Sequence, residues 1–378
     1  MENRKAGKVI ILAAFVVIIC MSNILWIIAK RFVDTSNHEN RLMAERPHLT
    51  LDSYSTFSRD FNSYFNDNLQ FRKQLVTLDS AVDYYIFDRS ANKEVIKGKA
   101  GWLFYTDTLA DYQRNNLYTE EELQSILDDV LLTKEYFDEK GIEFVIFIGP
   151  NKNTIYGEYM PSYIETYGDI SRVQQMVDYL KQNTDVKIIF PVEELLTAKK
   201  EHPELQNYFH LDTHWNYMGG FWASAPLLES LGVSPISIDE IKYEQMNEPD
   251  FIWYGYDEAN MIGLSAFLNS DVNYRVSSAM IDSVQFSGDI HTDSTVYSEA
   301  VRAYSDAYDR RKVFLIRDSF GEAISPYIAA SFGEMYSRYK NTLRLSEFDE
   351  EKPDIVVFEV VERKDFPGMF DYRNWEHD

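Results

Sequence analysis

The sequence predicts an α/β domain with a mostly parallel sheet covered by helices, preceded by a hydrophobic N-terminal segment. Amphipathic stretches alternate with short apolar runs through the middle of the chain, which is the order typical of α/β proteins. A run of uncharged residues near the N-terminus has the length of a membrane-spanning helix. The elements behind this prediction follow in chain order.

The hydrophobic N-terminal segment runs from Val9 to Ala29 without a charged side chain. A helix of this length spans the hydrocarbon core of a bilayer. The flanking basic residues give a slight preference for a cytoplasmic N-terminus: Arg4, Lys5 and Lys8 before the segment, Lys30 and Arg31 after it. We predict that residues 1–31 are a cytoplasmic tail and single-pass cell-membrane anchor, with the remaining chain extracytoplasmic. A cleaved signal peptide is the alternative.

Residues 32–95 are predicted to form a stalk and a helical extension. The stretch from Asp34 to Arg46 is polar and has few apolar positions. Between Leu51 and Arg89 the apolar residues recur at helical spacing, which predicts two amphipathic helices beside the main domain.

Residues 96–378 are predicted to form the main domain. Thr119 and Glu122 have the spacing of a capping box, and the apolar stripe that follows ends at Gly141. The apolar run 142–148 then predicts a buried strand, and helix followed by strand recurs over 170–190. Residues 240–300 contain no long periodic helix, so we expect an irregular or β-rich insertion at the edge where strands end.

Charge and cysteine content exclude several classes of function. Outside residues 1–31 the chain carries 32 basic and 60 acidic residues, a balance that repels nucleic acid and suits a neutral or zwitterionic glycan better. The sequence contains no P-loop or dinucleotide fingerprint, and we predict no cofactor. The only cysteine, Cys20, lies in the hydrophobic segment, so thiol catalysis in the main domain is excluded.

Two short segments about a hundred residues apart supply the side chains of a serine acyl-transfer site. The first contains Asp212 and His214 in Asp-Thr-His-Trp-Asn, and the second contains Ser319 in Arg-Asp-Ser-Phe-Gly. Serine needs an imidazole to take its proton and usually a carboxylate to orient that imidazole. We predict these roles for Ser319, His214 and Asp212. Structural alternatives are a helix cap at the serine and a capping or metal-binding pair at Asp212 and His214.

Further candidates lie near the same strand ends. Asn151 and Lys152 follow the strand at 142–148, and Arg317 precedes the serine, so we predict that these three bind substrate; for Asn151 and Lys152 a structural role in the loop is the alternative. His210 is the second choice for the base, since in an extended segment it lies on the same side as His214. A serine between a strand and a helix also lies beside backbone N–H groups that can hold an oxyanion. The G-x-S-x-G elbow is absent.

The two segments, in this order, resemble the alginate O-acetyltransferase family and its relatives known as DHHW proteins, which are SGNH-hydrolase-like. Three other stretches are similar to this family: 98–105, 150–156 with Pro161, and 352–359 with Glu362 and Arg363. One departure is Arg317, where the SGNH pattern usually has glycine.

The resemblance implies a three-layer SGNH-like fold and an extracytoplasmic O-acetyltransferase that modifies a surface or secreted polysaccharide through a serine acyl-enzyme. It also implies a multi-pass membrane O-acyltransferase as the partner that supplies acyl groups. Three alternatives stay open: a carbohydrate esterase with the same triad, a non-catalytic glycan-binding or assembly protein, and a metal-dependent hydrolase with Asp212 and His214 as ligands. We predict no metal.

Overall fold

The computed structural model describes residues 44–50, 53–67, 72–246, 256–268, 270–287 and 300–375. They belong to two compact units, Met1–Lys93 with Ala259–Phe267, and Glu94–Glu258 with Leu268–Asp378. The predicted membrane segment, Val9 to Ala29, lies outside the described residues. Among the residues that are described, no helix has both the length and the apolar character required to cross a membrane.

The first unit contains the two helices expected between residues 51 and 89. They are α2 (Phe57–Asp67) and α3 (Arg72–Tyr85). Hydrogen bonds join the two chain segments of this unit: Thr77 Oγ1 donates to the carbonyl of Gly263 (3.2 Å), and Asn92 Nδ2 donates to that of Met261 (2.9 Å).

The second unit is built on a sheet with seven strands in the described residues. Their order is β4-β3-β11-β9-β10-β8-β7. The first five run parallel, whereas β8 and β7 are antiparallel additions at one edge. The strands are β3 (Glu143–Gly149), β4 (Lys187–Ile189), β7 (Gln285–Ser287), β8 (Val301–Tyr304), β9 (Lys312–Arg317), β10 (Glu334–Tyr339) and β11 (Ile355–Val361). The predicted mostly parallel sheet is confirmed.

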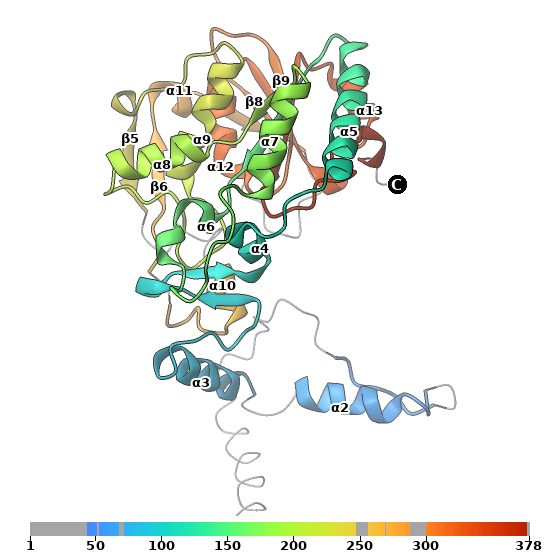
Figure 1. Cartoon of the computed structure of the whole chain (residues 1–378), viewed down its shortest axis with the longest axis vertical. Helices are drawn as coiled ribbons and strands as arrows, with labels where there is room; N and C mark the ends of the chain where they lie inside the picture. Colours follow the sequence, from blue (N-terminus) through green and yellow to red (C-terminus); the bar gives the residue numbers. More distant parts are fainter. Residues whose placement is uncertain are drawn as a thin grey trace, which may run out of the picture. The chain divides into compact units, whose positions relative to one another are not determined.

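Both faces of this sheet are buried, so its central strands are mostly apolar rather than alternating with polar residues. Successive side chains of a strand point to opposite faces. On β3, Val145 and Phe147 join one core cluster, while Phe144, Ile146 and Ile148 join the other. The first cluster packs under α8, α9 and α12, and the second under α5 and α7, which gives the three-layer arrangement seen in Figure 1.

The helices of the second unit begin largely where the sequence signals predict. Helix α5 starts after Thr119, whose side chain accepts from the N–H of Glu122 while the Glu122 carboxylate accepts from that of Thr119, as in a capping box. The helices of this unit are α4 (Leu109–Gln113), α5 (Glu120–Asp138), α6 (Lys152–Ile155), α7 (Arg172–Asn183), α8 (Val192–Glu201), α9 (Tyr217–Ser230), α11 (Ala279–Asp282), α12 (Gly321–Ser331) and α13 (Ser346–Glu351). Helix α10 (Asp257–Met261) begins in this unit, and its residues from Ala259 on belong to the first.

The region 240–300 consists of short elements, as expected of an irregular insertion. Strand β5 (Lys242–Gln245) pairs antiparallel with β6 (Tyr274–Ser277), separately from the main sheet. Another small sheet pairs β1 (Val95–Lys97) with β2 (Leu103–Tyr105). The structure describes neither residues 247–255 nor 288–299, so the insertion stays a prediction.

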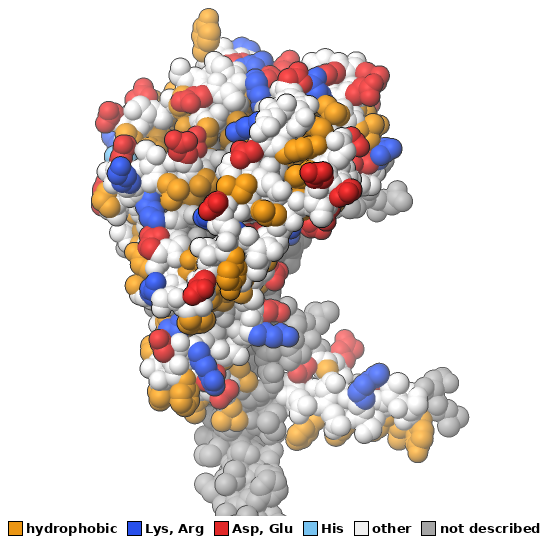
Figure 2. Space-filling model, viewed as in Figure 1, with side chains coloured by type: hydrophobic (Ala, Val, Ile, Leu, Met, Phe, Trp, Pro, Cys, Tyr) orange, Lys and Arg blue, Asp and Glu red, His pale blue; other side chains and the backbone are white. Residues whose placement is uncertain are grey.

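Acidic and basic side chains are interspersed over the face shown in Figure 2. Several basic groups of the second unit are paired with carboxylates. Arg172 lies 2.6 Å from Asp111, and Lys140 lies 2.6 Å from Asp349.

Candidate active site

The predicted nucleophile, Ser319, lies at the carboxyl end of β9, immediately before α12. Asp318 holds this turn with both carboxylate oxygens: Oδ1 accepts from the N–H of Phe320 (2.8 Å) and Oδ2 from that of Val361 (3.0 Å). The N–H of Asp318 donates to Glu359 Oε2 at 3.0 Å. The turn is therefore fastened to β11, the neighbouring strand.

Glycine is required directly after this turn. A Cβ atom at Gly321 would lie 2.5 Å from Cβ of Arg317 and 2.8 Å from Glu359 Oε2. Because neither a backbone-fixed Cβ nor a buried carboxylate can move far, a larger residue would displace the serine segment.

A second loop, between α8 and α9, carries Asp212 and His214. Tyr208 and Trp215 form an isolated antiparallel bridge, and the N–H of Phe209 donates to the carbonyl of His214 at 3.1 Å, so the loop is closed at its base. Trp215 Nε1 donates to the carbonyl of Phe320 at 2.9 Å. This hydrogen bond joins the loop to the serine segment, 105 residues further along the chain.

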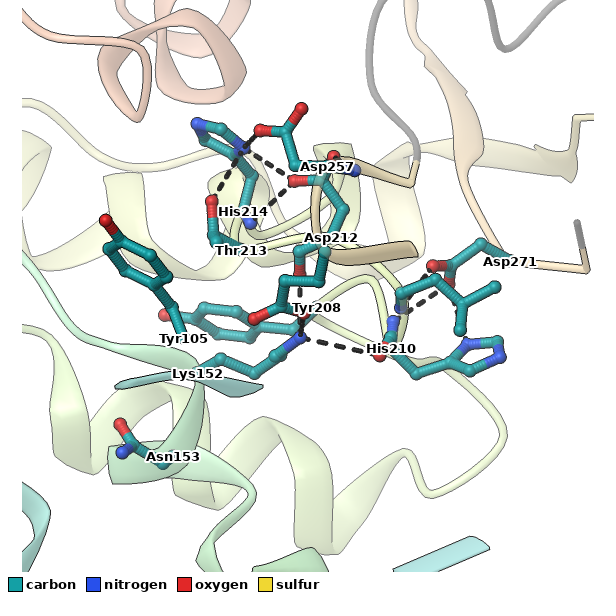
Figure 3. Close-up of polar contacts among 12 residues, drawn as sticks. Tyr105, Lys152, Asn153, Tyr208, His210, Asp212, Thr213, His214, Asp257 and Asp271 are labelled. Carbon is teal, nitrogen blue, oxygen red and sulfur yellow. Dashed lines mark hydrogen bonds and ion pairs between the residues drawn. The ribbon is translucent and has the colours of Figure 1, made fainter. Parts of the chain in front are cut away.

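The structure brings the three predicted triad residues together. His214 Nε2 lies 2.7 Å from Ser319 Oγ, and His214 Nδ1 lies 2.6 Å from Asp212 Oδ1. Asp212 is 1% exposed and His214 is 8% exposed. Figure 3 shows the Asp212 carboxylate beside the His214 ring. This is the order of contacts that lets a carboxylate fix the imidazole and the imidazole take a hydroxyl proton.

The charges of the pair shift both pKa values. Burial alone would raise the pKa of Asp212, but the charge and hydrogen bond of His214 outweigh it and bring that pKa to about 2. Burial would lower the pKa of His214, yet the carboxylate of Asp212 has the larger combined effect, and the pKa is raised. A low carboxyl pKa and a raised imidazole pKa are what a base needs to hold a proton during acyl transfer.

Asp257 is a site residue that the sequence did not reveal. Its N–H donates to Asp212 Oδ2 at 3.1 Å, and its Oδ2 lies 3.8 Å from His214 Nδ1. The charge of Asp212 and burial raise the pKa of Asp257 to about 6. Asp257 follows a stretch without periodicity and is 45 residues from Asp212, so only the fold makes the two neighbours.

Lys152, predicted to bind substrate, has its ammonium group inside the domain. Nζ donates to the carbonyl of Asp212 at 2.7 Å (Figure 3) and to Glu258 Oε2 at 2.5 Å. The two side chains are 4% and 0% exposed. Burial raises the pKa of Glu258 to about 7, although the charge of Lys152 opposes this rise. Lys152 thus links the backbone carbonyl of Asp212 to the side chain of Glu258, which directly follows Asp257 in the chain.

The other two predicted substrate residues are also buried. The N–H of Asn151 donates to Glu362 Oε2 at 2.7 Å, while its side-chain amide has no hydrogen-bond partner among the described residues. Arg317 donates to Ser337 Oγ at 3.0 Å and to the carbonyl of Asp318 at 3.2 Å. Substrate binding by these residues stays a prediction, and the side-chain amide of Asn151 has polar atoms that could serve it.

His210, the second choice for the base, has a different carboxylate partner. Its Nδ1 lies 2.8 Å from Asp271 Oδ1, and Asp271 also accepts from the N–H groups of His210 (2.9 Å) and Leu211 (2.8 Å). Figure 3 shows the His210 ring directed away from His214. The geometry therefore favours His214 as the base.

The N–H groups at the start of α12 were expected to be available for an oxyanion. Those of Phe320 and Gly321 are instead bonded to carboxylates, Asp318 and Glu359 respectively. The sequence could not show this because Glu359 approaches from β11.

Asp212, His214 and Asp257 also lie close enough together to be considered as metal ligands, with one ligand atom of each within 4.8 Å of the others. However, His214 faces Asp212 with one ring nitrogen and Ser319 with the other. A metal ligand nitrogen needs a free lone pair directed at the ion. The donor arrangement therefore fits a proton relay better than a metal centre.

Comparison with known proteins gives a match to one family model. Residues 95–242, which include Asp212 and His214 but end before Ser319, match the family model described as "SGNH hydrolase-like domain, acetyltransferase AlgX". This part of the chain is similar to an SGNH-hydrolase-like domain of the AlgX type. No curated protein matched the chain at a significant level.

Several solved structures are similar to this chain at low sequence identity, and the first of those below shares its fold. Bacillus cereus PatB1 has a TM-score of 0.51 and 16% identity, covering 72% of this chain and 98% of PatB1. A DHHW family protein from Eubacterium siraeum has 0.49 and 17%, covering 71% and 89%. The O-acetyltransferase domain of Pseudomonas putida AlgJ has 0.47 and 16%, covering 72% and 92%.

Proposed function

We propose that this protein is an O-acyltransferase that moves an acetyl group to a polysaccharide hydroxyl through an acyl-enzyme on Ser319. The observation that carries the proposal is the continuous set of contacts from Ser319 Oγ to His214 (2.7 Å) and from His214 to Asp212 (2.6 Å). The family model matched by residues 95–242, which is named for an acetyltransferase, supports the choice of acyl group.

The first half of the reaction loads the enzyme. His214 Nε2 takes the Ser319 proton as Oγ bonds to the acetyl carbonyl carbon, and a tetrahedral oxyanion forms. When the bond to the donor oxygen breaks, His214 gives that oxygen the proton. Asn151, whose amide is unpaired in the described residues, is our candidate donor to the oxyanion.

The second half repeats these steps with a sugar hydroxyl. His214 takes its proton, the sugar oxygen attacks the acetyl-Ser319 carbonyl, and Ser319 leaves with the proton returned by His214. Water in place of the sugar would make the enzyme an esterase with the same triad, so the two functions differ only in which hydroxyl reaches the acyl group.

The test measures p-nitrophenyl acetate turnover and transfer to oligosaccharides by the full chain in detergent. Ser319→Ala should abolish both while leaving the melting temperature nearly unchanged. His214→Ala should also abolish both, but at a lower melting temperature, because it leaves the buried carboxylate of Asp212 without its partner. Ser346→Ala removes an exposed serine hydroxyl and should behave as wild type. Full activity of Ser319→Ala would refute the serine mechanism. Loss of activity in chelator would favour the metal-dependent alternative, and product release without acceptor dependence would favour the esterase.

The cellular setting belongs to the same proposal. The 9–29 segment would anchor the protein in the cell membrane and leave the acidic domain outside the cytoplasm, where a multi-pass O-acyltransferase would supply acetyl groups. The protein should then stay with membranes after a high-salt wash, because salt weakens surface electrostatics but not an inserted helix. Recovery in culture fluid with an N-terminus beyond residue 29 would show a cleaved signal peptide.

A further inference from the structure

Arg363 lies at the edge of the sheet where the proposed catalytic residues gather. It follows β11 by two residues, and the N–H of Glu362 extends the pairing with β3 by donating to the carbonyl of Gly149 at 2.8 Å. Strand β11 lies between β3 and β9. Arg363 is therefore positioned between the strand end that carries Asn151 and the one that carries Ser319, which is where parallel sheets bind ligands.

Its guanidinium group packs on the residue that follows the nucleophile. The guanidinium carbon lies 5.2 Å from the centre of the Phe320 ring, and that ring lies 5.1 Å from the ring of His214. Stacking on an aromatic face leaves the N–H edge of a guanidinium available for other groups. The charge of Arg363 also acts on His214, since it opposes the rise of the imidazole pKa.

The guanidinium of Arg363 has no hydrogen bond or ion pair with any residue in the described ranges. Other arginines of this unit are engaged: Arg172 with Asp111, Arg302 with Glu351, and Arg311 with Asp309. Arg363 is partly exposed, so a ligand can reach it. With 60 acidic residues against 32 basic ones outside residues 1–31, an arginine that stays unpaired beside the triad is unusual and suggests a ligand of its own.

We propose that Arg363 forms an anion-binding subsite beside Ser319 and His214, which holds a carboxylate or phosphate group of the acceptor saccharide. A guanidinium offers two parallel N–H groups that match either oxyanion. Asp257, close to His214 and also within the influence of the Arg363 charge, places a carboxylate in the same site, so the acceptor is expected to carry a single anionic group rather than a dense series of them. The ligand class rests on the proposed acyl transfer, but the subsite is measurable without it.

The subsite is tested by ligand-observed NMR titration of the full chain in detergent. The probes are methyl glucoside, methyl glucuronide and methyl glucoside 6-phosphate, which share hydroxyls but differ in charge. Because a hydrogen bond to a charged group contributes about 1.5–3 kcal/mol, we expect a charged probe to bind about tenfold to a hundredfold more tightly than the neutral one. The stronger of the two charged probes identifies the oxyanion.

Variants then assign the effect to Arg363. Arg363→Met should lower the affinity for the charged probe to that for methyl glucoside. Arg363→Lys should retain part of the affinity for the charged probe, since lysine keeps the positive charge but not the two parallel N–H groups of the guanidinium. Lys364→Met removes the same charge one residue further on, from an exposed side chain, and should change nothing beyond twofold.

A catalytic measurement separates this inference from the proposed function. In Arg363→Met the KM of the charged acceptor should rise about tenfold to a hundredfold, while the KM of a neutral acceptor should stay close to that of the wild type. Equal binding of all three probes, or unchanged binding in Arg363→Met, would overturn the subsite. Absence of ester turnover in the wild type would refute the acyl-enzyme but leave the binding result to decide the subsite.

Discussion

Replacing Lys152 with methionine would remove a buried cation that contacts two parts of the proposed active site. Its Nζ donates to the carbonyl of Asp212 at 2.7 Å and to Glu258 at 2.5 Å. Hydrogen bonds of this charged kind contribute about 1.5–3 kcal/mol each. The substitution also leaves Glu258, which is 0% exposed, without its counter-charge. A loss of about 3–5 kcal/mol is typical of a buried pair broken on one side.

The loss should depend on pH, because Glu258 can become neutral. Its pKa is about 7 with Lys152 in place, against an ordinary 4.5. Without Lys152 the pKa of Glu258 in the folded state rises further. Glu258 of the folded variant therefore keeps its proton at a pH where the unfolded chain has released it. Above pH 7 the variant should therefore lose about 1.4 kcal/mol per pH unit relative to wild type, or roughly 2 kcal/mol more at pH 8.5 than at pH 7.

Urea unfolding followed by tryptophan fluorescence measures this difference. The signal reports on the sheet unit, which contains Trp102, Trp215, Trp222 and Trp375. Lys199→Met is the matched control, because Lys199 also joins a backbone carbonyl, that of Ile155, to a glutamate, Glu158, but it is 25% exposed. A stability loss in Lys152→Met that is the same at pH 6 and 8.5 would refute the reasoning, as would an equal loss in Lys199→Met.

Two other predictions concern titration. Asp257→Asn removes a carboxylate oxygen 3.8 Å from His214 Nδ1 but keeps the backbone N–H that donates to Asp212. The pKa of His214 should therefore fall, and the acid limb of the pH profile of kcat/KM should move to lower pH. An unchanged acid limb would contradict this prediction. Burial raises the pKa of Glu362 from 4.5 to about 7, so this group makes the free energy of unfolding fall by about 3 kcal/mol as the pH rises from 4.5 to 7. Glu362→Gln should flatten that fall in urea titrations, and an equally steep fall in the variant would rule out Glu362 as its source.

The parts of the site that the sequence predicts are those fixed by local pattern. The apolar run at 142–148 overlaps β3 (Glu143–Gly149), which is buried on both faces. Asp212 and His214 are two residues apart, so the loop alone brings their side chains into contact. The sequence also predicts Ser319 as a site residue, because it lies between an expected strand and an expected helix.

The parts that the sequence did not predict depend on contacts between distant segments. Asp257 and Glu258 come from a region without periodicity and reach the triad only through the fold. The burial of Lys152 could not be predicted, because a sequence shows that a residue is charged but not whether it is buried. Glu359 binds the N–H groups next to Ser319 from a parallel strand 41 residues away. Predicting such contacts requires the order of the strands in the sheet, and the apolar periodicity of the sequence does not reveal that order.

The acyl-enzyme on Ser319 is the central claim, and mass spectrometry tests it most directly. The full chain is mixed with p-nitrophenyl acetate, quenched in acid during turnover, digested and mapped. We expect one added acetyl group on the peptide that contains Ser319, lost again when an acceptor saccharide is supplied, and none in Ser319→Ala. Turnover with the acetyl group on another residue, or on none under conditions where the ester bond survives, would contradict the account.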